Sequence, residues 1–277
     1  MAKLPHWLPV IVSTDHALRI RRVGLDLDEV TSLITLAIAE DLDGGVDITT
    51  VSTVPLEQRS TLNLTARKAG VVSGAVVAAA VIDLVSQHTA DIEIVIPDGM
   101  EVAAGDVIVR ATGTTLSLLT AERTALNFLC HLSGIATLTS EWVHRLEGTN
   151  AKVRDTRKTT PGMRKMEKYA VTCGGGVNHR MSLSDAALIK DNHIVAAGGV
   201  VAAFDAVRRK FPEAAVEVEV DSMAQLHEVV AAGADLVLLD NFSVDEVRAA
   251  VQWNAGRARL EASGGITLDT EIGRAHV

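Results

Sequence analysis

Short apolar runs in the second half of the chain alternate with amphipathic segments, and each run ends in a polar side chain. The runs that we interpret as strands are 151–154, 187–190, 215–220, 236–240 and 258–263. The last three begin 21 and 22 residues apart, and segments that we interpret as apolar helices, such as 200–211 and 222–232, separate several of the five runs. Repeating strand and helix units of this length predict a parallel sheet covered by helices, as in an α/β barrel.

The first half of the chain has a different pattern, with mixed periods. Apolar residues at positions 30, 33, 34, 37 and 38 predict a helix over 28–40. Other segments predict strands over 61–66 and 91–96, helices over 76–85 and 116–131, and a hairpin over 98–109. This order of strands and helices predicts an α+β domain of the open-sandwich type.

These patterns divide the chain into four parts. Residues 1–24 form a leader that we expect either to be disordered or to precede the true start. Pro5 and Pro9 interrupt its apolar run, so it does not predict a signal peptide. The α+β sandwich domain covers 25–132, the α/β barrel domain covers 133–270, and 271–277 form a tail. Since no run of 18 apolar residues occurs, we expect no transmembrane helix and no membrane association.

Composition narrows the class of protein. The 277 residues are 48% hydrophobic and carry a formal net charge of −9, which suits a folded core and argues against bulk binding of nucleic acid. The two cysteines, Cys130 and Cys173, lack metal-ligand spacing, so we expect a reduced, cytoplasmic protein without disulfides. We interpret Cys173 as structural.

One stretch is rich in basic residues, although the chain as a whole carries a net negative charge. Between residues 152 and 168, seven basic residues accompany two acidic ones. Guanidinium and ammonium groups gathered in this way match carboxylates and phosphates, so the stretch predicts a site for a small anion. A solvated helix face over 161–170, with a proline in its first turn, explains Arg164, Lys165 and Lys168 equally well.

Polar groups also cluster after the basic stretch and at the ends of the predicted strands. Glycines 174–176 permit close backbone approach to a ligand, and Asn178, His179 and Arg180 follow them. The polar residues at the strand ends are Asp155, Lys158, Lys190, Glu219, Asp221, Asp240 and Ser263. A lone acid at such a place is as often a helix cap. Parallel strands of a barrel, however, bring their carboxyl ends to one mouth, so we expect these groups to meet there.

The segment 155–193, DTRKTTPGMRKMEKYAVTCGGGVNHRMSLSDAALIKDNH, resembles the signature of the quinolinate phosphoribosyltransferase family nearly residue for residue. The resemblance extends to the acidic turn 40–50, to TAERTALN at 120–127 and to EASGGIT at 261–267. It implies an enzyme that transfers the phosphoribosyl group of phosphoribosyl pyrophosphate to quinolinate with decarboxylation. The products would be nicotinate mononucleotide, pyrophosphate and CO2, in de novo NAD biosynthesis.

The resemblance also implies roles for individual residues. The catalytic residues would be Lys158, Lys190, Glu219 and Asp240. The substrate-binding residues would be Arg123, Thr156, Arg157, Lys158, His179, Arg180, Lys190, Glu219, Asp240, Ser263, Gly264 and Gly265. The cationic donors to the carboxylates of quinolinate would be Arg157, Arg180, His179 and Lys190. Arg123 would reach the site of the partner subunit in a homodimer or a higher oligomer. Glu219 and Asp240 would hold Mg²⁺, directly or through water, because magnesium prefers oxygen ligands.

Two other functions fit parts of the pattern. A related phosphoribosyltransferase acting on nicotinate or another acid would share much of the site, but Arg157, His179 and Arg180 together favour a dicarboxylate. A non-catalytic anion-binding relative is the second alternative, although all four catalytic residues are present. The tail EIGRAHV at 271–277 does not resemble the family. We therefore expect a truncated reading frame that lacks the native carboxyl end and leaves the barrel incomplete.

Overall fold

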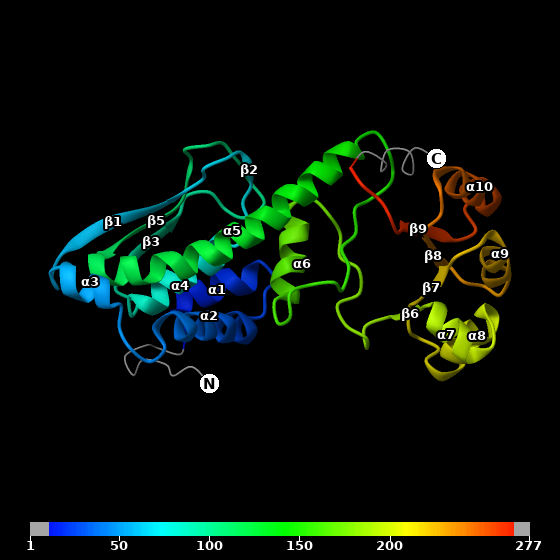
Figure 1. Cartoon of the computed structure of the whole chain (residues 1–277), viewed down its shortest axis with the longest axis horizontal. Coiled ribbons are helices and arrows are strands. Elements are labelled where there is room, and N and C mark those ends of the chain that lie inside the picture. The colour runs from blue at the N-terminus through cyan, green and yellow to red at the C-terminus, as the bar shows by residue number, and fades with distance from the viewer. Residues whose placement is uncertain (1–10, 269–277) are drawn as a thin grey trace. The chain divides into compact units, whose positions relative to one another are not determined.

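The computed structural model describes residues 11–268, which divide into two compact units (Figure 1). The first unit contains residues up to 143 together with 153–178, and the second contains 144–152 together with residues from 179 onward. The chain therefore passes between the units three times. The two domains expected from the sequence were divided at residue 132, which lies inside one long helix, α5 (Thr115–Arg145).

The first unit contains an antiparallel sheet in the order β1 (Arg59–Thr65), β5 (Val107–Thr114), β3 (Asp91–Ile94). A second sheet pairs β2 (Gly70–Val71) with β4 (Glu101–Val102). The predicted hairpin over 98–109 is therefore wrong, because its two strands belong to different sheets. Backbone bonds explain the difference, since Gly105 N–H donates to Ala66 O and Ala66 N–H donates to Asp106 O, both at 2.9 Å. These bonds tie the turn to the chain that follows β1.

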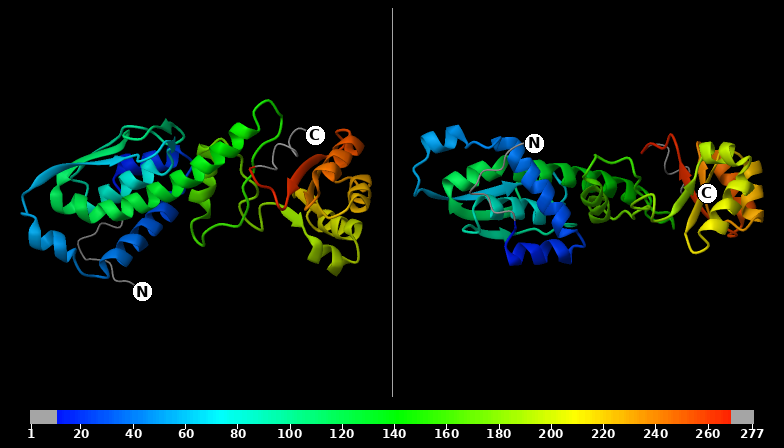
Figure 2. Two further views of the ribbon diagram at one scale, coloured as in Figure 1. Left: turned by 45° about the horizontal axis from the view of Figure 1, so that its top comes forward. Right: turned by 90° about the horizontal axis from the view of Figure 1, so that it is seen from below.

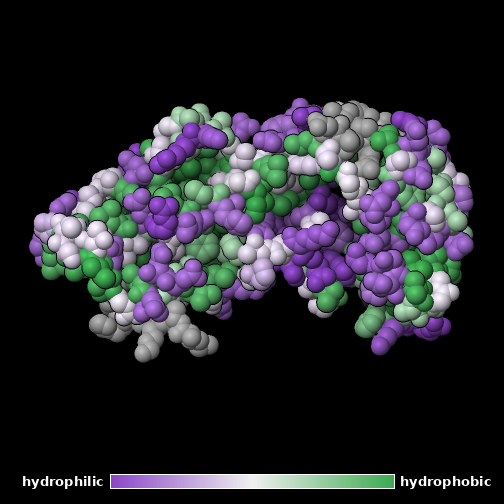
Figure 3. All heavy atoms as spheres, in the orientation of Figure 1, coloured by the Kyte–Doolittle hydropathy of each residue, from purple (hydrophilic) through white to green (hydrophobic). Residues whose placement is uncertain are grey.

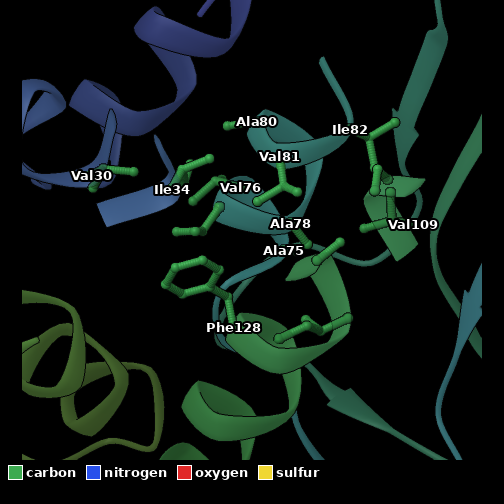
Figure 4. Packing of buried hydrophobic residues seen from close by; sticks show 14 of the residues in the cluster. Val30, Ile34, Ala75, Val76, Ala78, Ala80, Val81, Ile82, Val109 and Phe128 are labelled. Carbon is green, nitrogen blue, oxygen red and sulfur yellow. The ribbon is translucent and has the colours of Figure 1, made fainter. Parts of the chain in front are cut away.

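Helix α4 (Ala75–Val85) is the centre of the first core. All eleven of its residues are buried, which agrees with a sequence that is apolar on every side apart from Asp83. Figure 4 shows Val30 and Ile34 of α2 (Leu27–Leu42), Val109 of β5 and Phe128 of α5 packed around it. The unit is completed by α3 (Ile48–Thr53) and α6 (Arg164–Cys173).

Part of the leader is ordered, which corrects our expectation for residues 1–24 within the described range. Residues 14–22 form helix α1 (Thr14–Arg22), whose Ile20 is fully buried in the first core. The buried Asp83 carboxylate of α4 accepts the Ser13 backbone N–H at 2.8 Å and lies 3.0 Å from Nδ1 of His88. Because arginines flank Ile20 in the sequence, the apolar face of this short helix is not evident from the hydrophobic pattern.

The second unit is built on a parallel sheet in the order β6 (Ala187–Ile189), β7 (Val216–Val220), β8 (Leu236–Asp240), β9 (Arg259–Ser263). The helices between these strands are α7 (Asp191–Ala197), α8 (Val200–Lys210), α9 (Met223–Ala231) and α10 (Val244–Asn254), and Figure 2 shows them from two sides. The α+β and parallel α/β architectures predicted from the sequence are confirmed. No helix in the described part of the chain has both the length and the apolar character needed to cross a membrane.

The predicted strand over 151–154 does not join this sheet. Val177 N–H donates to Val153 O at 2.9 Å and Asp155 N–H donates to Val177 O at 3.2 Å. Arg154 and Val177 thus form an isolated parallel bridge inside the first unit.

Candidate active site

The sheet of the second unit separates apolar from charged side chains. Strand β7 reads Val-Glu-Val-Glu-Val, and because successive strand residues point to opposite faces, Glu217 and Glu219 share one face. The three valines of β7 lie on the other face, in the core formed with α8, α9 and α10. In register, Glu219 pairs with Leu238, which pairs with Glu261 of β9. Three glutamates from two strands therefore share the face that the helices leave uncovered.

Lys190 and Glu219 meet at the carboxyl edge of this sheet. Lys190 immediately follows β6, and its Nζ lies 2.7 Å from Oε2 of Glu219. The Lys190 side chain is 47% exposed, whereas that of Glu219 is only 14% exposed. Glu219 therefore fixes the position of the Lys190 ammonium group, while the Lys190 side chain stays accessible to an anionic substrate.

Asp240 and Ser263 are direct neighbours at the same edge, as the ends of the paired strands β8 and β9. Asn241 donates from Nδ2 to Oδ2 of Asp240 at 2.8 Å, and its backbone N–H donates to Ser263 O at 2.9 Å. Gly264 follows with φ +87°. A Cβ there would lie 2.1 Å from Oδ1 of Asn241 and 2.9 Å from its backbone nitrogen, so only glycine fits at this position.

His179 is held by hydrogen bonds to both ring nitrogens. Its Nε2 lies 2.7 Å from Oε2 of the buried Glu217, and its Nδ1 accepts the Arg180 backbone N–H at 2.7 Å. A nitrogen that accepts a hydrogen bond carries no proton, so Nε2 carries it and donates to Glu217. These two bonds fix the orientation of the His179 ring, and its inclusion among the donors to a carboxylate stays a prediction.

The ligating atoms of His179, Glu217 and Glu261 lie within 4.8 Å of one another, a spacing that could hold a metal ion. A metal on Nε2 would require the proton on Nδ1, where it would face the Arg180 N–H donor. The hydrogen bonds therefore indicate that these side chains orient the His179 ring, rather than that they bind a metal ion. Arg180 itself donates from Nη1 to Ala186 O at 2.7 Å and is half-buried.

In the first unit, α6 fixes the loop that carries Thr156, Arg157 and Lys158. Lys168 forms an ion pair with Asp155, and these side chains are only 1% and 6% exposed. The neighbouring Glu167 accepts the Thr160 backbone N–H at 3.1 Å and lies 2.9 Å from Nε2 of His131. Two adjacent residues of α6 therefore hold the two ends of the loop.

The environment of Glu167 keeps it ionised. Burial by itself raises the pKa of this carboxyl, but hydrogen bonds from Thr160 and His131 outweigh burial, so the pKa lies below its ordinary value.

The expectation of a solvated helix face is wrong for Lys168, which is buried in its ion pair with Asp155. The expectation fits Lys165, which forms an exposed ion pair with Glu29. The helix also begins later than expected, at Arg164, with the loop containing Pro161 before it.

The glycine run packs against protein, which corrects the expectation that it approaches a ligand. A Cβ on Gly174 would lie 2.3 Å from Ala136 O in α5, and one on Gly176 would lie 2.7 Å from a methyl group of Val171. The neighbouring Cys173 is a free cysteine whose pKa is raised by burial, which agrees with a structural role.

Gly174→Ala should lower the free energy of unfolding by about 1–3 kcal/mol, because the added methyl group overlaps backbone that cannot move aside easily. Urea denaturation would measure the loss. Gly134→Ala is the matched control. Gly134 lies in α5, and a methyl group there would have open space around it among the described residues, so alanine should stabilise by up to about 1 kcal/mol. Equal effects of the two substitutions would contradict the packing role of Gly174.

Arg123 lies exposed on α5, one turn after the exposed Leu119. The adjacent Thr124 is buried and donates from Oγ1 to Oδ2 of Asp41 at 3.1 Å. This bond ties the acidic turn to the helix and leaves the Arg123 face outward.

The structure thus brings together Lys190 with Glu219, and Asp240 with Ser263 and Gly264, each within the second unit. Sequence reasoning gave no role to Glu217, Asn241 and Glu261, and it did not predict that Glu167 and Lys168 hold the loop 155–160. The alternation of β7 could have revealed Glu217, because it places Glu217 on the same face as Glu219.

Comparison with known proteins gives matches along nearly the whole chain. Residues 47–133 match the family model described as quinolinate phosphoribosyl transferase, N-terminal domain, and residues 135–273 match the corresponding C-terminal domain. A nicotinate-nucleotide pyrophosphorylase [carboxylating] of Mycobacterium leprae is 47% identical over 88% of this chain and 87% of that protein. A probable enzyme of the same name from Bacillus subtilis is 39% identical over 87% and 83%.

The fold agrees with these sequence matches. The solved structure of the nicotinate-nucleotide pyrophosphorylase from Francisella tularensis superposes with a TM-score of 0.86 at 39% identity, covering 90% of this chain and 88% of that one.

Proposed function

Because the chain belongs to the quinolinate phosphoribosyltransferase family, it is an enzyme of the carboxylating nicotinate-nucleotide pyrophosphorylase type, and we propose how its residues carry out that reaction. The observation that carries this proposal is the polar edge of the second sheet, where Lys190 contacts Glu219 at 2.7 Å and Asp240 adjoins Ser263. A cation for phosphates stands there beside carboxylate oxygens that can accept hydrogen bonds from a ribose, as phosphoribosyl transfer requires.

Quinolinate carries two adjacent carboxylates, which call for several fixed hydrogen-bond donors. We assign them to Arg157, Arg180 and Lys190, with Arg123 supplied by a partner subunit. His179 belongs to this set as well, with its ring oriented by Glu217. Thr156 belongs to the same proposed binding set.

The phosphates of phosphoribosyl pyrophosphate would be bound by Lys158 and Lys190, and the 5-phosphate by the hydroxyl and backbone donors of the turn 263–265. Glu219 and Asp240 would face the ribose hydroxyls and hold Mg²⁺, directly or through water. Their carboxylate oxygens suit magnesium, and the side chains stand at an accessible sheet edge. A bound magnesium ion would neutralise charge on the pyrophosphate.

The reaction needs no covalent nucleophile from the protein. The ring nitrogen of quinolinate attacks the anomeric carbon of the ribose while the bond to pyrophosphate breaks. Glu219 and Asp240 would stabilise the positive charge that develops on the ribose, and the lysines would stabilise the departing pyrophosphate. The ribosylated ring nitrogen is cationic, so it stabilises the carbanion left on the adjacent ring carbon when that carboxylate leaves as CO2, and a proton from water then adds to this carbon.

The direct test incubates the chain with phosphoribosyl pyrophosphate, Mg²⁺ and either quinolinate or nicotinate, and identifies the products by mass spectrometry. We expect nicotinate mononucleotide and CO2 from quinolinate. Product from nicotinate alone would overturn the assignment to a dicarboxylate substrate. Removal of divalent cations with a chelator should abolish turnover if magnesium takes part as proposed.

Arg180→Ala should weaken quinolinate binding by at least about 1.5 kcal/mol, the lower end for a charge-assisted hydrogen bond. Isothermal titration calorimetry would measure the affinity, and thermal denaturation would show whether loss of the Arg180 bond to Ala186 O affects folding. Arg248→Ala is the control, since Arg248 forms an exposed pair with Asp245 on α10 and has no proposed role. Unchanged quinolinate affinity in Arg180→Ala would remove Arg180 from the proposed site.

We also propose that the enzyme is a cytoplasmic homodimer. Hydrophobic side chains gather over α3 in Figure 3, where Ile48 is 77% exposed and Val51 is 50% exposed. Such a patch on a folded unit is typical of an interaction surface, and a second copy of the chain would cover it. Sedimentation velocity of the wild type and of Ile48→Asp would test this assembly.

A further inference from the structure

We propose that Asn241, which lies outside the residues assigned to the reaction, is a positioning residue that orients Asp240 and the turn 263–265 together. This inference rests on the function proposed above and deepens it. It predicts that Asn241 governs the binding of phosphoribosyl pyrophosphate and magnesium without affecting the binding of quinolinate.

The first support is the contact between neighbouring side chains. Asn241 donates from Nδ2 to Oδ2 of Asp240 at 2.8 Å. This bond uses one carboxylate oxygen and leaves the other for a ribose hydroxyl or a cation. A neutral amide donor also orients the carboxylate without cancelling its charge, whereas a lysine or arginine in the same place would compete with a metal ion.

The second support is the backbone of Asn241. Its φ of 58° lies in the left-handed region, which asparagine tolerates better than most other residues. In this conformation its N–H reaches Ser263 O at 2.9 Å, beyond the last paired residues of β8 and β9. Asn241 therefore supplies the last backbone bond that pairs the two strand ends.

The third support is the close approach of Gly264. A Cβ on Gly264 would meet the side chain and the backbone nitrogen of Asn241 at 2.1 Å and 2.9 Å, so the turn passes directly over Asn241. One side chain thus contacts the proposed ribose and magnesium ligand on one side and the proposed phosphate turn on the other. These parts bind the same substrate, which is why we expect the two effects to appear together.

Asn241→Gly is the principal variant, because glycine adopts the positive φ without strain while the amide is removed. We expect the KM for phosphoribosyl pyrophosphate and the magnesium concentration for half-maximal rate to rise by about 10- to 100-fold, as for other groups that orient a metal ligand. The KM for quinolinate and the melting temperature should stay close to the wild type.

Asn241→Asp tests the role of the amide donor while the size and shape of the side chain stay nearly the same. It replaces the donor with a second carboxylate beside Asp240, so affinity for phosphoribosyl pyrophosphate should again fall. Ala255→Gly is the matched control, because Ala255 also has a positive φ, at the exposed end of α10, and carries no proposed role. This control should leave both KM values unchanged.

Binding of phosphoribosyl pyrophosphate with Mg²⁺, measured by calorimetry, separates this inference from the proposed function. A wild type that binds this substrate but makes no product from quinolinate would overturn the proposed function, and weaker binding to Asn241→Gly would still support the positioning role. Unaltered binding and unaltered magnesium dependence in a folded Asn241→Gly would overturn the role of Asn241. An equal rise in both KM values, with a lower melting temperature, would show a purely structural role and would also overturn it.

Discussion

Replacing Lys190 by methionine is expected to lower kcat/KM by about 10²- to 10³-fold, the usual cost of removing one fixed donor to developing negative charge. Lys190 is proposed to contact both the phosphates and quinolinate, and Glu219 holds its ammonium group in place at 2.7 Å. Methionine retains much of the length of the side chain and removes the charge. Steady-state rates with each substrate varied would measure the loss.

The fold should survive this change. The Lys190 side chain is nearly half exposed, and ion pairs of this kind contribute only about 0–1 kcal/mol to stability. Lys210→Met is a suitable control, because Lys210 is an exposed lysine at the end of α8. If Lys190→Met keeps the wild-type kcat/KM, Lys190 has no part in the reaction.

The second large effect concerns stability. Lys168→Met should lower the free energy of unfolding by about 3–5 kcal/mol, because it leaves the Asp155 carboxylate buried without its cation. Asn178, in the amide orientation that satisfies its neighbours, donates to Asp155 Oδ2 at 2.6 Å and to Lys168 O at 2.9 Å. One amide cannot replace the lost charge. Urea denaturation followed by circular dichroism would give the difference.

Lys165→Met provides the comparison on the same helix. Its ammonium group pairs with Glu29 at 2.7 Å with both side chains about half exposed, so its loss should cost no more than about 1 kcal/mol. Replacing both partners of the buried pair, in Lys168→Met with Asp155→Leu, should recover part of the stability. Equal losses in Lys168→Met and Lys165→Met would show that burial does not strengthen the pair.

Local periodicity predicted much of the fold. Strand β8 was predicted to the residue and α8 to within one residue, because each has an uninterrupted pattern between clear ends. Helix α5 was predicted to end at 131 and continues to Arg145. Beyond the predicted end, Ser133 Oγ accepts the Ser73 N–H at 3.0 Å and donates to Ser73 O at 3.1 Å. Long-range bonds of this kind are not visible in a local pattern.

The candidate site was predictable where it depends on strand register. Lys190 follows β6 and Glu219 lies near the end of the neighbouring parallel strand, so their contact could be expected from the sequence. The burial of Lys168 could not, because it depends on the path of the loop that returns Asp155 to α6. The role assigned to the glycine run failed for the same reason, since side chains and backbone from other segments occupy the space around it.

The three passages of the chain between its units limit how this protein can be divided or recombined. A gene fragment ending at residue 133 would cut α5 and would lack α6, whose Met166 and Ala170 belong to the first core. Domain exchange between relatives would therefore succeed with a junction after residue 178, where the last segment of the first unit ends. The nine residues 144–152 belong to the second unit, so they would have to come from the same parent as that unit. A shuffled library with its crossover at the boundary between the two family models would instead build the first core from two different parents.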